Sequence, residues 1–212
     1  MMIRVLVADD HALVRHGLRQ VLGAASDLSL VAEAKNAWEV IERIRHGGID
    51  VLLLDMSMPG PSGVELIQRI RIEAPRVPVL VLSMHADAQI AARAIKAGAS
   101  GYLTKDSEPE QLIEAIRQVG RGGKFIDPLL ATRMVFETGH TATETAAHAS
   151  LSNREYQVFL AIVHGRSLVD IAKELLLSPK TVSTHKIRLM QKLGVDSVSD
   201  LVRYALRQGL AQ

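Results

Sequence analysis

Five short segments in the first 125 residues have the character of strands, and each is followed by a stretch with apolar residues at helical spacing. The central run, residues 51–54, has four aliphatic residues in succession, which is typical of a strand covered on both faces of a parallel sheet. Because strands and helices alternate strictly, we expect a parallel sheet with helices on both of its faces.

The expected strands are residues 3–8, 28–34, 51–54, 78–83 and 101–105. The smallest fold with this pattern is the flavodoxin-like α/β fold, a (βα)5 unit with strand order 2-1-3-4-5. In that order the first and third strands are neighbours, and every strand ends at the same edge of the sheet. Residues at the carboxyl ends of the strands should therefore lie close together.

Polar residues stand at four of these strand ends. Asp9 and Asp10 follow the first strand, Asp55 follows the third, Ser83 ends the fourth, and Lys105 ends the fifth. Three carboxylates, a hydroxyl group and an ammonium group should thus converge on one edge. Taken alone, each acidic residue could merely cap the next helix.

Three clustered carboxylates repel one another unless a cation joins them, and Mg²⁺ prefers such oxygen ligands. With that cation bound, Asp55 could act as a nucleophile and form an aspartyl phosphate. Ser83 and Lys105 could then stabilise the phosphoryl oxygens. The chain has no GxxxxGK[ST] loop, so its phosphoryl donor is not expected to be ATP bound by this chain.

Residues 151–212 contain only helical patterns and are basic, with nine Lys or Arg against five Asp or Glu, a net charge of +4. Ser178 followed by Pro179 is a strong signal for the start of a helix. We expect four short helices, of which the second and third have helix-turn-helix proportions. On the third, Val182, Ile187, Leu189, Met190 and Leu193 are expected to form the core face.

Residues 126–150 separate the two patterns. The segment opens on Asp127 and Pro128, could begin as a short helix, and then becomes rich in Thr and Ala. We interpret it as a flexible linker whose two histidines, His140 and His148, are solvated. The expected domains are therefore residues 1–125, a linker at 126–150, and residues 151–212.

The absence of cysteine suits a reducing cytoplasm, and the first strand reaches Asp9 too early for a signal peptide. No apolar run approaches membrane-spanning length. We expect a cytoplasmic protein with no membrane partner.

Residues 1–125 resemble the receiver domain of bacterial two-component response regulators. The resemblance rests on the order and spacing of several sites, which are Asp9-Asp10, Asp55, Met58-Pro59-Gly60, Ser83, Tyr102 and Lys105. Ser83 stands where the family more often has Thr, and it keeps the hydroxyl group.

This resemblance implies a role for each residue. Asp55 would take a phosphoryl group from the phosphohistidine of a sensor histidine kinase. Asp9, Asp10, Asp55 and the backbone carbonyl of Ser57 would hold Mg²⁺. Ser83 and Lys105 would bind the phosphoryl group, with Tyr102 packed inward behind Ser83. Phosphorylation would then bias a two-state element of the fold.

Residues 151–212 resemble the LuxR-type helix-turn-helix domain, on the segments 151–155, 171–173 and 178–185. The two halves together resemble the NarL/FixJ-type regulators, which implies a phosphorylation-dependent transcription regulator that binds double-stranded DNA at a two-fold operator. The residues expected to contact DNA are Lys180, Thr181, Ser183, Thr184, Lys186, Ile187, Arg188 and Lys192. The residues expected to pair two DNA-binding domains in a homodimer are Val198, Leu201, Val202 and Ala205. RNA polymerase is a further candidate partner.

Two other classes remain as alternatives. A phosphatase of the haloacid-dehalogenase type could also use Asp55 and Mg²⁺, but it places a second Asp where this chain has Ser57, and the basic helical region would stay unexplained. A ligand-sensing regulator could share the C-terminal half, but it needs a pocket that is usually rich in aromatic residues, and aromatic residues make up only 3% of this chain.

Overall fold

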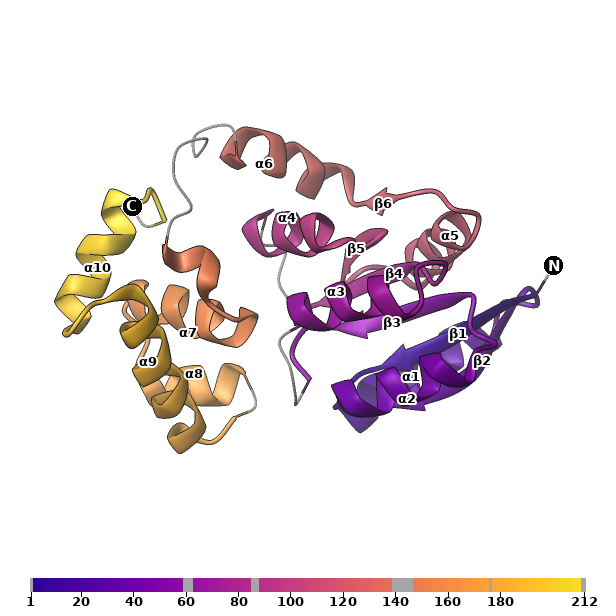
Figure 1. Ribbon diagram of the computed structural model, residues 1–212, viewed down its shortest axis with the longest axis horizontal. Helices are drawn as coiled ribbons and strands as arrows, with labels where there is room; N and C mark the ends of the chain where they lie inside the picture. Colours follow the sequence, from indigo (N-terminus) through magenta and orange to yellow (C-terminus); the bar gives the residue numbers. More distant parts are fainter. Residues whose placement is uncertain (1, 59–62, 85–87, 139–146, 176, 211–212) are drawn as a thin grey trace. The chain divides into compact units, whose positions relative to one another are not determined.

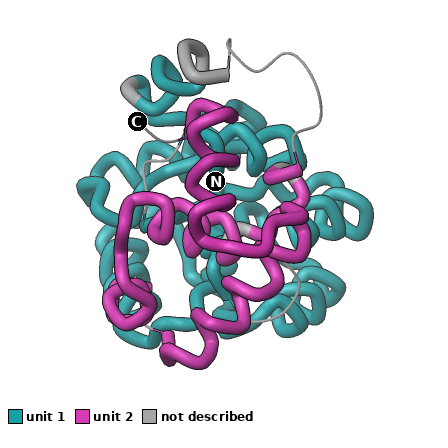
Figure 2. Tube along the Cα trace, turned by 90° about the vertical axis from the view of Figure 1, so that its left-hand side faces the viewer, with its two compact units in different colours: residues 1–142 teal, residues 143–212 magenta. Residues whose placement is uncertain are grey.

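The computed structural model describes residues 2–58, 63–84, 88–138, 147–175 and 177–210. The chain divides into two compact units, residues 1–142 and residues 143–212, which are described separately below (Figures 1 and 2). The loop residues Pro59 and Gly60 and the linker residue His140 lie outside the described residues.

The first unit is built around one parallel sheet with strand order β2-β1-β3-β4-β5-β6. Its strands are β1 (Ile3–Ala8), β2 (Leu28–Ala34), β3 (Val51–Asp55), β4 (Val79–Ser83), β5 (Gly101–Thr104) and β6 (Phe125–Ile126). The expected order 2-1-3-4-5 is confirmed. The sixth strand is an addition that the sequence pattern did not reveal, because two residues are too few to show a period.

Helices cover both faces of this sheet, as Figure 1 shows. They are α1 (Ala12–Gly23), α2 (Ala37–His46), α3 (Gly63–Glu73), α4 (Ala88–Ala97) and α5 (Pro109–Gly120). Leu22 of α1 and Ile116 of α5 share one buried cluster with Val7 and Leu53 of the sheet, so α1 and α5 cover the same face. The neighbouring helices α2, α3 and α4 cover the other face.

The central strand β3 is buried along its whole length, including Asp55 at its end. Burying one large aliphatic side chain stabilises a fold by about 1.5–3 kcal/mol. Strand β3 therefore places an acidic residue at the edge of a fully buried part of the unit. A further helix, α6 (Pro128–Thr138), packs against α4 and accounts for the helix expected at the start of the linker segment.

The second unit begins with a short 3-10 helix, η1 (Ala147–Ser150), followed by four helices. These are α7 (Asn153–Val163), α8 (Leu168–Glu174), α9 (Pro179–Leu193) and α10 (Val198–Arg207). Each of the four starts at a serine whose hydroxyl oxygen accepts a hydrogen bond from the backbone N–H three residues further along the chain. These N-cap residues are Ser152, Ser167, Ser178 and Ser197.

An aromatic cluster holds the second unit together. Phe159 of α7 lies with its ring centroid 6.0 Å from that of Tyr156 and 6.2 Å from that of Tyr204 on α10. The hydroxyl oxygen of Tyr204 accepts a hydrogen bond of 3.0 Å from the backbone N–H of His148. The expectation that His148 is merely solvated is therefore wrong, because η1 docks it against α10.

Candidate functional site

The carboxyl ends of β1 and β3 bring three acidic residues together. These strands are neighbours, with Ala8 opposite Leu54, so Asp9 follows one strand beside Asp55 at the end of the other. Asp9 is 1% exposed and Asp55 is 3% exposed, whereas Asp10 is more open to solvent. One ligand atom from each of Asp9, Asp10, His11 and Asp55 lies within 4.8 Å of the others.

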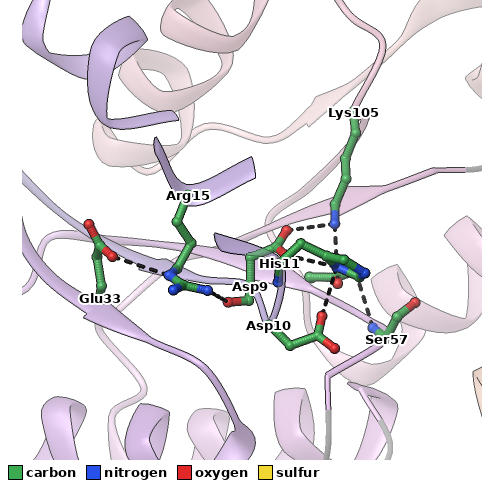
Figure 3. Close-up of polar contacts among 8 residues, drawn as sticks. Asp9, Asp10, His11, Arg15, Glu33, Ser57 and Lys105 are labelled. Carbon is green, nitrogen blue, oxygen red and sulfur yellow. Dashed lines mark hydrogen bonds and ion pairs between the residues drawn. The ribbon is translucent and has the colours of Figure 1, made fainter. Parts of the chain in front are cut away.

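Lys105 reaches this cluster from the end of β5 (Figure 3). Its Nζ lies 2.6 Å from Oδ2 of Asp9 and 3.1 Å from Oδ2 of Asp55, and its side chain is only 8% exposed. A buried ammonium group between two buried carboxylates offsets their mutual repulsion, and this attraction is strong because little water screens it. The expected convergence of Lys105 with the acidic residues is thus present in the structure.

Backbone donors orient the carboxylates. The N–H of His11 donates to Oδ1 of Asp9 at 2.8 Å, and the N–H of Ser57 donates to Oδ1 of Asp55 at 3.2 Å. Each acid therefore receives a hydrogen bond from the residue two positions further along its own loop. Such local bonds restrict the side-chain rotamers and keep both carboxylates aimed at the same edge.

Ser83 and Tyr102 lie on the two strands beyond β3. Ser83 ends β4 opposite Thr104 and is 3% exposed, and its carbonyl oxygen accepts a 2.8 Å hydrogen bond from the N–H of Lys105. Tyr102 on β5 lies opposite Val81 and is fully buried. The sheet thus places the hydroxyl-bearing residue and the inward-packed aromatic residue on adjacent strands at the same edge.

The acidic residues fit a hard divalent cation. Three carboxylates supply oxygen ligands, and a cation of this kind usually takes a few carboxylates plus water. Oδ1 of Asp10 lies 2.9 Å from Nδ1 of His11, yet within the described part of the chain this buried oxygen accepts no well-formed hydrogen bond. An oxygen in that position suits a cation better than it suits a directional donor.

In the second unit, α8 and α9 pack together as the two helices of the expected helix-turn-helix. Helix α9 carries an exposed face at helical spacing, made of Lys180, Thr184, Ile187 and Arg188. The remaining residues expected to face DNA there, Thr181, Ser183 and Lys186, are half-buried. Ile187 is 58% exposed, so its expected place on the core face is wrong, because it lies across the helix from Leu189.

Lys192, near the end of α9, is engaged within its own unit. Its Nζ lies 2.7 Å from Oε2 of Glu155 and donates to the carbonyl oxygen of Ser150 at 3.3 Å. The carboxylate of Glu155 also accepts a 2.7 Å hydrogen bond from the N–H of Ser152, which completes the N-terminal cap of α7. Lys192 therefore anchors α9 to the start of α7.

The surface expected to pair two domains on α10 is only partly available. Leu201 and Ala205 are fully buried in the core of the unit, so their side chains cannot reach a partner, and the expectation needs correcting for these two residues. Val198 is 39% exposed and Val202 is half-buried on the same helix. Leu206, which was not among the residues expected to pair two domains, is 52% exposed.

Comparisons with known proteins agree with this geometry. Residues 5–117 match the model of the response regulator receiver domain, and residues 149–205 match that of the bacterial regulatory proteins of the luxR family. Response regulator UvrY of Escherichia coli (strain K12) is 36% identical over 209 residues, which cover 99% of this chain and 96% of that protein.

The chain belongs to the NarL/FixJ-type response regulators.

Two further relatives place this response regulator within its family. The oxygen regulatory protein NreC of Staphylococcus carnosus (strain TM300) is 37% identical over 214 residues, covering 98% of this chain and 99% of that protein. A solved structure of the two-component response regulator RcsB with DNA has a TM-score of 0.61 and 28% identity, and it covers 97% of this chain and 98% of that one.

The response regulator acts on transcription through a LuxR-type DNA-binding domain, and it is not a dedicated enzyme. Both alternatives are set aside, since residues 5–117 match a receiver domain rather than a phosphatase or a ligand-sensing domain. Among the described helices, none combines the length and the apolar character needed to cross a membrane.

Two residues beside the acidic pocket of this response regulator were not predicted from its sequence. Nδ1 of His11 lies within 3.3 Å of Oδ1 of Asp9, and Arg15 donates to the backbone carbonyl of Asp9 at 2.9 Å. His11 directly follows the acidic pair, which was the available signal. Arg15 lies one helical turn further along α1, on the side that faces the sheet, and nothing in its local sequence distinguishes it from an ordinary surface arginine.

Proposed function

We propose that Asp55 accepts a phosphoryl group from the phosphohistidine of a sensor histidine kinase, and that this modification controls dimerisation and sequence-specific DNA binding. The observation that carries the proposal is the buried carboxylate of Asp55, which ends the central strand 3.1 Å from the Lys105 ammonium group and within an acidic cluster. In the transfer, a carboxylate oxygen of Asp55 bonds to phosphorus while the bond from phosphorus to the histidine nitrogen breaks.

The cofactor in this proposal is Mg²⁺, held by Asp9, Asp10, Asp55 and the backbone carbonyl of Ser57. When bound, the cation neutralises negative charge on the pocket and on the incoming phosphoryl group. Lys105 supplies a second positive charge, and Ser83 supplies a hydroxyl donor. Tyr102 fills the space behind Ser83, so a change at the pocket is passed into β4 and β5.

For DNA binding, we propose that the exposed face of α9 enters the major groove. Lys180, Thr184, Ile187 and Arg188 form this face, and Thr181, Ser183 and Lys186 flank it. The net charge of +4 on residues 151–212 favours a polyanion, and RcsB, a relative over nearly the whole chain, has a structure with DNA. Lys192 is assigned a structural role instead, because its amine is bonded to Glu155.

The proposal includes a division of the chain into a receiver domain at residues 1–125, a linker at 126–150 and a DNA-binding domain at 151–212. Its partners are a sensor histidine kinase, a two-fold operator in double-stranded DNA, a second copy of this chain and, at a promoter, RNA polymerase. The relatives are bacterial proteins, and the absence of cysteine suits the bacterial cytoplasm as the location.

The test of phosphorylation is the intact mass of the chain after incubation with Mg²⁺ and acetyl phosphate. Wild type should gain one phosphate, and Asp55→Asn should gain none. Glu110→Gln, an exposed acid on α5, serves as the matched control and should be labelled like wild type. An adduct that persists in Asp55→Asn, or that forms equally well without Mg²⁺, would contradict the proposal.

Dimerisation through α10 is tested separately. Val202→Lys should weaken binding to a two-fold operator, because it places a charge on the half-buried side of that helix, without lowering binding to a half-site. Operator affinity equal to that of wild type would remove α10 from the proposed dimer surface.

A further inference from the structure

Behind the acidic pocket lies a charged network that the proposed chemistry does not use. Arg15 and Arg19 of α1 both contact Glu33 of β2. Figure 3 shows that Arg15 also contacts the backbone of Asp9 in the pocket. Arg15 is a buried charged residue, 8% exposed, whereas the side chain of Arg19 is 58% exposed. A buried guanidinium group needs strong partners, since desolvating its charge is costly.

The partners of Arg15 connect the pocket to the edge of the sheet. Its Nη1 donates to the carbonyl oxygen of Asp9 at 2.9 Å, and its Nε donates to Oε2 of Glu33 at 3.2 Å. The planar guanidinium group fixes the angle between these two bonds, which a lysine could not do. Arg15 therefore holds the backbone of Asp9 at a set distance from β2.

Every other polar atom of Asp9 is also bonded. Its N–H donates to the carbonyl oxygen of Ala34 at 3.1 Å, Oδ1 accepts from the N–H of His11, and Oδ2 accepts from Lys105. The bond from Arg15 restrains the peptide that joins Asp9 to Asp10, because it holds the carbonyl oxygen of that peptide. Rotation of that peptide would move both carboxylates.

An irregularity in β2 makes the network possible. Val5 pairs with Leu30 and Val7 pairs with Glu33, so an advance of two positions along β1 corresponds to an advance of three positions along β2. Paired residues of a parallel sheet face the same side, and this bulge turns Glu33 to the face that carries Leu30 and α1. Without it, Ala32 would lie opposite Val7, and Arg15 would lose its acidic partner.

One carboxylate, that of Glu33, lies between the two guanidinium groups of the network. Arg19, together with Arg15, holds the pKa of Glu33 below its usual range, against the opposing effect of partial burial. Glu33 is therefore ionised at neutral pH and offsets the buried charge of Arg15. The exposed Arg19 adds a contact to Glu33 but, among the described residues, makes no hydrogen bond to Asp9, which makes it a natural control.

We propose that Arg15, supported by Glu33, is a positioning residue that orients Asp9 and Asp10 to bind the cation. By favouring cation binding, Arg15 would also favour phosphoryl transfer to Asp55. This inference rests on the function proposed above. A positioning role and a purely electrostatic role for Arg15 predict opposite changes in cation affinity when Arg15 is removed. If Arg15 acted only through its charge, removing it would strengthen cation binding, because a nearby positive charge would be gone. If Arg15 positions the acids, removing it weakens cation binding.

The test is calorimetric titration of the full chain with Mg²⁺ for wild type, Arg15→Gln, Arg15→Lys and Arg19→Gln. Removing a partner that orients metal ligands typically lowers metal affinity about 10- to 100-fold, and we expect a loss in this range for Arg15→Gln. Arg15→Lys keeps the positive charge but loses the planar guanidinium group that makes both hydrogen bonds. This variant should therefore also bind Mg²⁺ more weakly than wild type. Arg19→Gln should stay within about twofold of wild type, because the bonds of Arg15 are intact.

A second readout separates positioning from general damage. The Mg²⁺ concentration that gives half the maximal rate of acetyl phosphate labelling should rise in Arg15→Gln, while the rate at saturating Mg²⁺ stays near that of wild type. If Arg15→Gln does not fold by circular dichroism, Arg15→Lys carries the test alone.

Equal or tighter Mg²⁺ binding by a folded Arg15 variant, with normal binding by wild type, overturns the inference and leaves the proposed function intact. A wild type that binds no Mg²⁺ overturns the proposed cofactor, and the inference fails with it.

Discussion

In the first unit, Asp9, Asp55 and the side chain of Lys105 are all less than a tenth exposed, whereas Lys180 and Arg188 on α9 of the second unit are exposed to solvent. The pocket residues come from three different strands and meet only because of strand order. The α9 residues come from one helix and share a face because of its 3.6-residue period. A buried site therefore depends on long-range register, and a surface site depends mainly on local sequence.

This difference has energetic consequences. Buried charges interact strongly with one another, so removing one should have a large effect on the chemistry of the pocket. Exposed charges on α9 are screened by water and salt, so each should contribute modestly to DNA affinity, and its contribution should fall as the ionic strength rises. This contrast between buried and exposed charges can be tested by substitution, and the largest effect is expected in the pocket.

The sharpest test of the buried site is Lys105→Met. Removing the ammonium group leaves Asp9 and Asp55 without their shared cationic partner, and the incoming phosphoryl oxygens lose a donor. We expect acetyl phosphate labelling of Asp55 to slow by about 100-fold or more, as with the loss of one preorganised donor in other active sites. The rate is measured by intact mass against time at saturating Mg²⁺.

Lys124→Met, at an exposed position between α5 and β6, is the control and should be labelled at the wild-type rate. Rapid labelling of Lys105→Met would show that the buried ion pairs are structural only, and the contrast between the two units would lose its main support.

The exposed face of α9 is tested by comparing Arg188→Ala with Lys192→Ala. Arg188 is exposed, so its loss should weaken DNA binding and reduce the slope of log affinity against log salt by about 1. Lys192 is bonded to Glu155, so its loss should leave that slope unchanged and instead destabilise the unit by about 1–3 kcal/mol. Fluorescence anisotropy at several salt concentrations measures the first effect, and urea unfolding measures the second.

If the two variants changed the salt slope equally, Lys192 would contact phosphate after all. The bond to Glu155 would then be one that DNA displaces, and the division of α9 into an exposed binding face and an anchored end would be wrong.

The smallest expected effect concerns His185, which lies on α9 but is half-buried. Burial lowers the pKa of its imidazole, Arg154 and Arg188 lower it further, and Glu155 partly opposes this. Within the described chain, its buried Nδ1 also has no hydrogen-bond partner. The folded unit therefore binds the proton less well than the unfolded chain does.

A histidine with a lowered pKa contributes stability above its unfolded pKa of about 6.5, and this contribution is lost as the pH falls from that value through the lower pKa of the folded unit. We expect the free energy of unfolding to fall more steeply between pH 7 and pH 5 in wild type than in His185→Gln. Urea titrations of the full chain, followed by circular dichroism, measure the difference. Parallel pH profiles would mean that His185 is protonated equally well in both states.

How far the sequence could predict the site differs between the two units. Asp9, Asp10, Asp55, Ser83 and Lys105 were found because each lies at the end of an expected strand, and parallel strands end at one edge of a sheet. Arg15 was missed because its partners, the carbonyl of Asp9 and the carboxylate of Glu33, belong to other elements of the fold. Its importance depends on a bulge in β2 that leaves no mark in the local sequence.

On the helices, the sequence predicted the starts better than the faces. Ser178 and Pro179 marked the beginning of α9 correctly, because capping is a local interaction. Ile187 was placed in the core although it is exposed, and Leu201 and Ala205 were placed on a dimer surface although they are buried. Which side of a helix is covered depends on its neighbours, and the apolar residues of a short helix do not identify them.

By itself, the sequence determined the alternation of strands and helices, the strand ends that carry acidic and basic groups, and the helix caps, because each follows from short-range periodicity or hydrogen bonding. Only the tertiary structure decided that Arg15 and Glu33 support Asp9, that Lys192 pairs with Glu155, and which residues of α10 remain exposed. Arg15 and Glu33 are 18 positions apart in the sequence, and Glu155 and Lys192 are 37 positions apart. Packing of the chain, rather than a local pattern, therefore determines these contacts.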